Sequence, residues 1–437
     1  MRLTRKTSAL LSLALVSQAA AFCGFFVAKA DTKLFNRSNQ VIIARDGNRS
    51  VFTMMNDYQG NVKDFARIVP IPVVPKREDI RIGDPNIVKK LDAYSAPRLV
   101  EYFDEDPCLP PRPMPTAVPA SAAVEDSGAP RKLRADALGV KIEASYQVGE
   151  YDVLILSARQ QNGLATFLRG EGYKLPAGAE KMLGDYLRGG MKFFVVRVNL
   201  ERFDKSGGGF LNPIVMTYQS ERFMLPIRLG TLNSPGTEQD LTLYLLSSEG
   251  QVETSNYRTA KIPSGQEVPL FVKNDFANFY RDLFKTAHIR EGRDVPLMEY
   301  AWNTNWCDPC STEPPTPAEL AEAGVFWRQE NAGPQVKPAL PALKIPDTPG
   351  KPVYLTRLHV RYTAKTYPQD LHFKVTKNTD NFQGRYVLRH PYTGAARCEA
   401  GRQYRVSLPK RHEQQAQNLA RLTGWDIGDI RKRMQKQ

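Results

Sequence analysis

The residues most able to do chemistry form the run Trp306-Cys307-Asp308-Pro309-Cys310. A Trp-Cys-x-x-Cys run has the form of a thiol–disulfide oxidoreductase active site, in which Cys307 would attack and Cys310 would resolve the mixed disulfide. Such a pair is reactive because a helix that begins at the first cysteine favours the thiolate over the thiol.

The residues around this motif do not favour such a helix. Pro314, Pro315 and Pro317 follow it, and a proline inside a helix removes a backbone hydrogen bond and clashes with the preceding turn. Residues 299–305, before the motif, do not have the pattern of a buried parallel strand. We therefore predict that the two cysteines form a structural disulfide in a loop or pair elsewhere. A redox-active pair and half of a metal site stay open as alternatives.

The number of cysteines limits the disulfides. Five is odd, so at most two bridges form within one chain and one thiol is left over. We expect a Cys307–Cys310 bridge and a second bridge between two of the other three, which are Cys23, Cys108 and Cys398.

The start of the chain predicts export. Arg2, Arg5 and Lys6 precede an apolar stretch that ends in small residues at Ala21, which is the pattern of a secretory signal peptide over residues 1–21. The apolar stretch is shorter than the roughly 20 residues that cross a bilayer. Lipid attachment at Cys23 is disfavoured because the residue before it is not small. We expect a periplasmic or extracellular protein without a membrane-spanning segment, in a compartment where disulfides persist.

The charge balance is basic, with 60 Lys and Arg against 46 Asp and Glu and a formal net charge of +14. The two signs are interleaved along most of the chain, which is typical of a solvated surface. Nucleic acid is not expected as a partner of an exported protein. An anionic envelope component or a protein partner fits the charge.

No other motif predicts catalysis, a cofactor or a metal. The five histidines, which include His359, are scattered without a metal-binding pattern. His359 lies between Leu358 and Val360, so it is predicted on the polar face of a strand in a surface or hydrogen-bonded structural role. The basic end of the chain around Trp425 could dock on a membrane surface, although a helix that caps the domain is the favoured interpretation.

The pattern along the chain predicts an α+β fold: mainly antiparallel, sandwich-like sheets, several packed helices and long proline-rich loops. A hairpin is expected around Asp46-Gly47. A helix is expected after Asp84 and Pro85, with a second short helix ending near Phe103. Prolines in residues 62–75 predict a strand that lies at a sheet edge or leaves the sheet there.

Later segments are assigned in the same way. Helices are predicted within residues 162–173, 175–190, 275–287, 316–327 and 411–435. Strands are predicted within residues 151–158, 191–200, 212–220, 221–230, 240–250, 251–262, 351–363, 370–377, 384–394 and 402–409.

These elements divide the chain into successive parts. They are a signal peptide (1–21), a β-rich part with two short helices (22–106), a proline-rich linker or loop (107–135), a central α/β and antiparallel β part (136–308), a proline-rich excursion with a short helix (309–352), and a C-terminal β part with a basic terminal helix (353–437).

Several runs resemble a bacterial family known as domain of unknown function 2330. They are AFCGFFVAKADTKLFN, NDYQGNVKDFARIVPIP, DAYSAPRLVEYFDEDPC, LATFLRGEGYKLPAGAEKMLGDYLRGGMKFFVV, YLTRLHVRYT, DLHFKV and LTGWDIGDIRKRM. The resemblance implies an exported bacterial protein, and it brings no catalytic residue or cofactor to any position of this sequence.

Overall fold

The structure is a computed structural model of the whole chain. It describes residues 25–28, 35–36, 39–56, 58–59, 65–109, 140–158, 163–199, 202, 211–233, 238–306, 308, 311–328 and 350–436.

The largest sheet has nine strands in the order β16-β17-β18-β14-β3-β4-β12-β7, with β20 pairing with β17 off this path. Its centre includes the predicted hairpin, in which Gly47 adopts a φ of +54° at the turn between β3 and β4. Strand β14 runs parallel to β3, whereas its other neighbour, β18, is antiparallel. The strands are β3 (Asn39–Asp46), β4 (Arg49–Asn56), β7 (Ile80–Ile82), β12 (Leu211–Gln219), β14 (Gln239–Ser247), β16 (Ala260–Lys261), β17 (Leu297–Asn303), β18 (Tyr354–Tyr362) and β20 (Phe382–Gln383).

A second sheet has five strands in the order β1-β6-β11-β10-β9, all antiparallel. Strand β6 carries Pro70 and lies inside this sheet, but its neighbour β1 pairs only with residues 65–68. The missing N–H of Pro70 therefore costs no ladder bond to β1, and the strand ends one residue later. The strands are β1 (Phe25–Ala28), β6 (Phe65–Ile71), β9 (Val140–Val148), β10 (Tyr151–Ala158) and β11 (Lys192–Val198).

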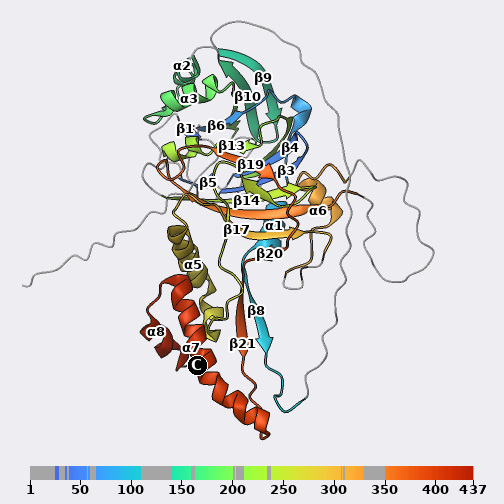
Figure 1. Cartoon of the computed structure of the whole chain (residues 1–437). Helices are drawn as coiled ribbons and strands as arrows, with labels where there is room; N and C mark the ends of the chain where they lie inside the picture. The colour runs from blue at the N-terminus through green and yellow to red at the C-terminus, as the bar shows by residue number, and fades with distance from the viewer. Residues whose placement is uncertain are drawn as a thin grey trace, which may run out of the picture.

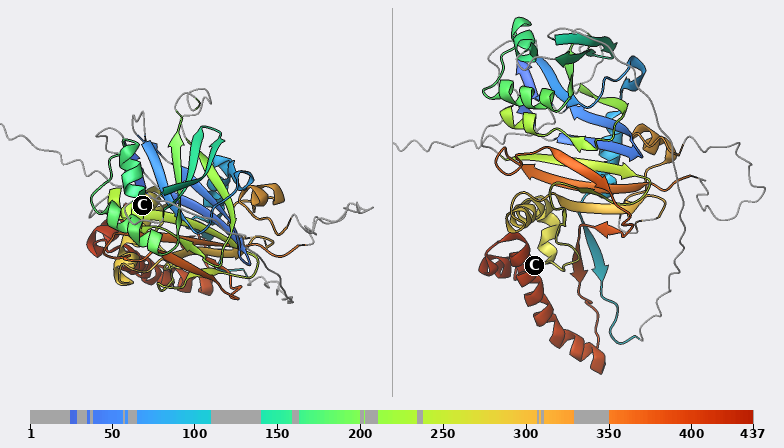
Figure 2. Two further views of the ribbon diagram at one scale, coloured as in Figure 1. Left: turned by 90° about the horizontal axis from the view of Figure 1, so that it is seen from above. Right: turned by 45° about the horizontal axis from the view of Figure 1, so that its top comes forward.

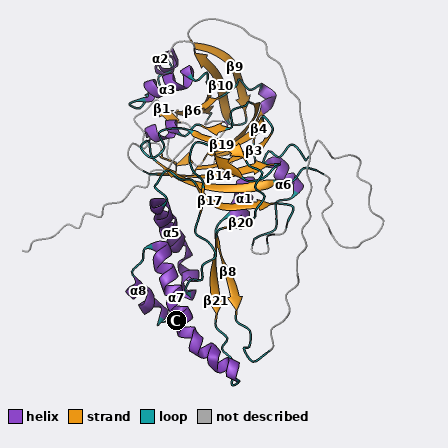
Figure 3. Ribbon diagram, in the orientation of Figure 1, coloured by secondary structure: helices purple, strands orange, loops and turns teal. Residues whose placement is uncertain are grey.

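The two sheets pack face to face as a sandwich, with helices on both outer faces (Figures 1 and 2). Buried Val69 and Phe194 of the smaller sheet share one core with Leu243 and Leu358 of the larger sheet. The layers run from helices through two sheets to helices, as the colouring by element shows (Figure 3). The predicted α+β class with mainly antiparallel sheets is confirmed.

Each outer face of the sandwich has its own helices. Helices α2 and α3 bury Leu168 and Leu183 on the smaller sheet. Helices α1 and α6 bury Leu91 and Leu320 on the larger sheet, and α5 covers the same face further along and buries Leu283 in a core that it shares with α7 and α8. The helices are α1 (Pro85–Ser95), α2 (Gly163–Gly170), α3 (Ala179–Arg188), α5 (Phe276–Arg290), α6 (Pro317–Glu322), α7 (Glu399–Thr423) and α8 (Ile427–Met434), with short 3₁₀ helices η1 (Arg77–Asp79), η2 (Arg228–Asn233) and η3 (Leu270–Asp275).

Smaller sheets complete the fold. Strands β8 and β21 form a parallel pair that extends away from the sandwich beside α7 (Figure 1). The remaining short strands pair as β13-β19-β15 and β2-β5. Their bounds are β2 (Phe35–Asn36), β5 (Tyr58–Gln59), β8 (Arg98–Phe103), β13 (Met224–Leu225), β15 (Val252–Thr254), β19 (Leu371–Val375) and β21 (Arg385–His390).

Three predicted elements were wrong. The second short helix, ending near Phe103, is strand β8, because residues 98–103 pair with β21. Residues 402–409 are helical, because α7 already begins at Glu399, where Cys398 caps it. The strand predicted over residues 221–230 is limited to β13, and the chain then enters η2.

The predicted start of α1 provides a test of helix capping. Asp84 accepts a hydrogen bond from the Asn86 backbone N–H at 2.8 Å. We expect Asp84→Ala to lower the free energy of unfolding by about 1 kcal/mol, because the helix loses the acceptor for an otherwise unpaired donor. Asp84→Asn keeps an acceptor and serves as the control. Urea denaturation of the three proteins measures this, and equal values for Ala and Asn would contradict the capping role.

Candidate functional site

The outer face of the large sheet carries a row of ionised side chains. Arg357, His359 and Arg361 alternate along β18 with Leu358 and Val360, which point into the sandwich core. The three basic side chains meet acidic side chains from α1, β17 and β14. We call this group the charge ladder; its members are Asp92, Arg357, Glu299, His359, Asp240 and Arg361.

The inner half of the charge ladder is centred on Glu299, whose side chain has no exposed surface. Arg357 Nε donates to Glu299 Oε2 at 2.6 Å, and its Nη1 donates to Asp92 Oδ1 at 2.7 Å. The second carboxylate oxygen of Glu299 lies 2.8 Å from His359 Nδ1. Both oxygens of the buried carboxylate therefore have a basic partner, as burial of a charge requires.

The outer half of the ladder continues from the other nitrogen of the same imidazole. His359 Nε2 lies 3.2 Å from Asp240 Oδ1. Arg361 binds the same carboxylate through two hydrogen bonds of 2.8 Å each, which is the bidentate geometry that suits a guanidinium. Acidic and basic groups therefore alternate from one end of the ladder to the other.

A β-bulge places Glu299 in this row. The pairing of β17 with β18 shifts register between Met298 and Tyr300, so Glu299 is the extra residue. Its carbonyl accepts a hydrogen bond from the Gly384 N–H at 2.7 Å. Bulges redirect side chains within sheets, and here the result is a carboxylate that faces β18 from a strand of otherwise apolar character.

Aromatic residues of α5 cover the ladder. The Phe284 ring stacks on His359 with a centroid separation of 3.7 Å, and the Arg361 guanidinium lies 4.9 Å from the same ring centroid. The Tyr280 hydroxyl donates to Glu299. At the other end, the Tyr244 hydroxyl donates to Asp92 Oδ1 at 2.8 Å. The centre of the ladder is therefore closed by side chains, and its two end carboxylates remain partly exposed.

The ladder favours the ionised forms of Glu299, His359 and Asp240. Burial alone would raise the pKa of Glu299, but Arg357 and His359 outweigh it and lower that pKa to about 2. Burial opposes the charge of His359 as well, yet its two carboxylate partners raise its pKa above the usual value. The pKa of Asp240 is also lowered, because His359 and Arg361 outweigh its burial. Removal of one buried member would leave its partner with an uncompensated buried charge.

A neighbouring histidine has the opposite character. His288 of α5 is buried, and its Nδ1 has no hydrogen-bond partner among the described residues. Burial lowers the pKa of His288 to about 4, aided by Arg361 and Arg293 and opposed by Glu238. The folded protein therefore holds His288 as the neutral imidazole.

This contrast predicts a pH dependence. A histidine with a lowered pKa stabilises the fold above its ordinary pKa of about 6.5, and this contribution is lost as the pH falls toward the folded value of about 4. The raised pKa of His359 makes the opposite contribution, because it stabilises the fold more as the pH falls. The effect of His288 must therefore be isolated by comparison with a variant that changes only this residue. We expect the stability advantage of the native protein over His288→Gln to shrink between pH 7.5 and pH 5, measured by urea denaturation. A difference that stays constant across that range would contradict the assignment.

The cysteines are only partly within the described residues. Cys108 and Cys398 form a disulfide with a Cα–Cα distance of 5.8 Å, across 290 residues of sequence. It joins the loop after β8 to the N-cap residue of α7. Cys23, Cys307 and Cys310 lie outside the described residues, so the expected Cys307–Cys310 bridge stays a prediction.

The described residues around the Cys-x-x-Cys motif are fixed without a helix. Asp308 is buried and accepts hydrogen bonds from the Tyr300 hydroxyl at 3.2 Å and from Gln383 Nε2 at 2.8 Å. The Ser311 hydroxyl donates to the Tyr94 carbonyl at 2.6 Å. Residues 311–316 are not helical, and α6 begins only at Pro317. These contacts anchor Asp308 to the large sheet and Ser311 to α1.

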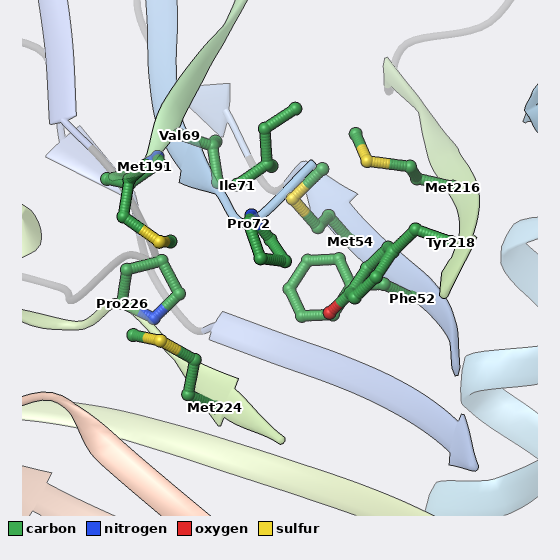
Figure 4. Close-up of a pocket in the computed structure, with 11 residues that line it drawn as sticks. Phe52, Met54, Val69, Ile71, Pro72, Met191, Met216, Tyr218, Met224 and Pro226 are labelled. Atoms are coloured by element: carbon green, nitrogen blue, oxygen red, sulfur yellow. The ribbon is translucent and has the colours of Figure 1, made fainter. Parts of the chain in front are cut away.

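An apolar pocket lies between the sheets, away from the charge ladder (Figure 4). Its cavity is about 10 Å³, which is room for about one water molecule. Two of its methionine sulfurs accept from arginines: Met54 from Arg67 at 3.2 Å and Met191 from Arg222 at 3.3 Å. Its lining residues are Phe52, Met54, Val69, Pro70, Ile71, Pro72, Met191, Met216, Tyr218, Met224 and Pro226.

No group of three or more His, Cys, Asp or Glu in the described part of the chain is arranged to hold a metal ion. No helix in that part combines the length and apolar character needed to cross a membrane.

Residues 17–374 match the family described as "uncharacterized protein conserved in bacteria", DUF2330. The chain belongs to this family. The DUF2330 match covers the charge ladder and every strand of both sheets except β20, and it ends before β21, α7 and α8. No curated protein and no solved structure matches the chain.

The sequence pattern revealed only part of the charge ladder. It placed His359 on the polar face of a strand, and the structure shows it there, paired on both nitrogens. It missed Glu299, Asp240 and Asp92 as its neighbours. The spacing of Arg357, His359 and Arg361 at every second residue is a signal that could have revealed a charged row. Nothing local to residue 299 signals the bulge that supplies the central carboxylate.

Proposed function

We propose that this protein is an exported cell-envelope protein that acts by binding or by a structural role, and not by catalysis. The observation that supports a non-catalytic role is the charge ladder. It gathers the most strongly perturbed carboxylates of the described residues, yet its central carboxylate is fully buried and both its oxygens are occupied. A catalytic acid or base needs access to a substrate atom, whereas these groups reach one another.

The disulfide and the start of the chain support export. A Cys108–Cys398 bridge persists in an oxidising compartment, and residues 1–21 have the pattern of a signal peptide. The basic net charge of +14 fits an anionic envelope component as partner, with a protein partner as the other class.

Expression of the full chain in a Gram-negative host, followed by fractionation and non-reducing peptide mapping, tests this proposal. We expect a periplasmic or secreted protein that begins at Phe22 and contains a linked Cys108–Cys398 peptide. An uncleaved protein that stays in the cytosol with free thiols would overturn it.

The alternative function, thiol–disulfide exchange by Cys307 and Cys310, needs a separate assay. We expect the purified protein to reduce insulin no faster than its Cys307→Ser variant. A structural bridge at this motif would have a reduction potential below about −300 mV, whereas an exchange-active pair falls near −120 to −270 mV. Insulin reduction that disappears in Cys307→Ser would establish the oxidoreductase and refute the non-catalytic role.

A further inference from the structure

The C-terminal helices carry a concentrated positive charge. Residues 397–437 contain ten Lys and Arg against four Asp and Glu, a net charge of +6 out of +14 for the whole chain. This segment lies beyond residue 374, where the family match ends. Such a concentration attracts polyanions, because nearby like charges add their fields.

The first half of α7 projects from the body of the protein (Figures 1 and 2). The second half of α7 buries Ala416, Leu419 and Leu422 in the core that it shares with α5. The first half has few buried residues. The disulfide from Cys398 to Cys108 holds its start. Near the middle of α7, Arg411 Nη1 lies 2.6 Å from Asp104 Oδ2 and forms an ion pair with it. The projecting half is therefore a fixed, solvent-exposed helix.

One side of this projecting half combines cations with an exposed apolar side chain. Arg402, Arg405, Val406, Pro409 and Lys410 are spaced by three or four residues, so they share one side of the helix. All five are exposed, and Val406 is 80% exposed. Arg405 and Lys410 form no ion pair with any described residue. Cations without internal partners are available for an external one.

Further exposed cations lie on and after α8. Arg431 of α8 lies 2.6 Å from Glu413 of α7, which fixes the second helix beside the middle of the first. Lys432 and Lys436 are exposed. At the other end, exposed Arg397 directly precedes the disulfide. We call six exposed cations in and next to these two helices the basic C-terminal surface; they are Arg397, Arg402, Arg405, Lys410, Lys432 and Lys436.

Apolar side chains at the projecting end favour a lipid surface over a soluble polyanion. Besides Val406, Leu109 is 63% exposed and directly follows Cys108, which is bonded to the cap of α7. Exposed aliphatic side chains add little to the binding of a soluble polyanion. An interfacial helix, by contrast, inserts such side chains between lipid headgroups while its cations bind the phosphates.

We propose that the basic C-terminal surface docks this protein on membranes that contain anionic phospholipids. The inference rests on the proposed export to the envelope and names the partner and the site. Each Lys or Arg near an anionic bilayer raises the affinity about fivefold, and the attraction weakens as salt is added.

Sedimentation of the purified mature protein with vesicles tests the proposal. We expect binding to vesicles of phosphatidylglycerol mixed with phosphatidylcholine, no binding to phosphatidylcholine alone, and release at high salt. The triple substitution Arg397→Glu, Arg405→Glu, Lys410→Glu should weaken binding at least about 100-fold, because three attractive charges are lost and three repulsive ones are added. Val406→Ser should weaken binding at unchanged charge.

The matched control reverses three exposed lysines elsewhere: Lys89→Glu, Lys181→Glu, Lys365→Glu. These lie on α1, on α3 and after β18, and none forms an ion pair with a described residue. The net charge changes equally in both triple variants, so the control should retain most of the binding. Equal losses in the two variants, binding to neutral vesicles, or absence of binding to anionic vesicles would each overturn the docking site.

Other occupants give distinguishable results. A soluble polyanion can be added as a competitor for the vesicles. If it releases the native protein and the Val406→Ser variant from anionic vesicles equally well, the site binds polyanions in general and the lipid proposal is refuted. These assays use purified protein, so their failure leaves the export experiment standing, and failure of export leaves a measured lipid affinity in place.

Discussion

Glu299→Gln is expected to lower the free energy of unfolding by about 3–5 kcal/mol, because it leaves buried Arg357 without its closest counter-charge. The glutamine amide has nearly the same shape as the glutamate carboxylate, so no cavity forms. The loss of stability therefore measures the effect of removing the negative charge. The partial exposure of Asp92, the second partner of Arg357, limits how far it can compensate. Urea denaturation at neutral pH provides the measurement.

A glutamate in an exposed pair is the matched control. Glu253 lies 3.4 Å from Lys374 at the surface, and Glu253→Gln should change the stability by less than about 1 kcal/mol. The double variant Glu299→Gln, Arg357→Met should be more stable than Glu299→Gln alone, because the unpaired buried charge has gone. A loss below about 1 kcal/mol for Glu299→Gln would show that the ladder does not hold the sheet and helices together.

Removal of the disulfide should have the second large effect. We expect Cys108→Ser, Cys398→Ser to lose about 2–5 kcal/mol, because the bridge spans 290 residues of sequence and restricts the unfolded chain strongly. Cys398 Sγ accepts from the Gly401 N–H at 3.2 Å as the cap of α7, and a serine keeps that cap. The loss therefore reports the covalent link and not the helix start.

Chemical denaturation with and without a thiol reductant checks this. The reductant should destabilise the native protein and leave the Cys108→Ser, Cys398→Ser variant much less affected. If native and variant proteins unfold at the same urea concentration, the bridge contributes nothing to stability.

Elements with local signals were predictable from the sequence. The hairpin at Gly47 and the helix capped by Asp84 are specified by residues within a few positions of each. The class, α+β with mainly antiparallel sheets, followed from the alternation of such elements. These features depend on backbone preferences and on the period of apolar residues, both of which are visible in a short window.

Features that depend on distant partners were not predictable. Strand β8 looked helical because its partner β21 begins 287 positions later, at Arg385 against Arg98. The parallel placement of β14 beside β3 likewise joins segments about 200 residues apart. The charge ladder needs that strand order and also the bulge at Glu299. The register between strands that are remote in sequence is set by the packing of the whole core. A short window of the sequence does not contain the information that fixes this register.

The order of strands in the large sheet has a consequence for how the protein is made. Two later strands flank the β3–β4 hairpin: β12 pairs with β4, and β14 pairs with β3. Strand β14 in turn pairs with β18, which ends at Tyr362. Under the proposed export, the chain leaves a translocation channel from its N-terminus onward, so the sheet cannot close until most of the chain has emerged, and high contact order slows this step. We expect the nascent N-terminal strands to depend on holding chaperones, and fragments that stop before β18 to aggregate instead of folding.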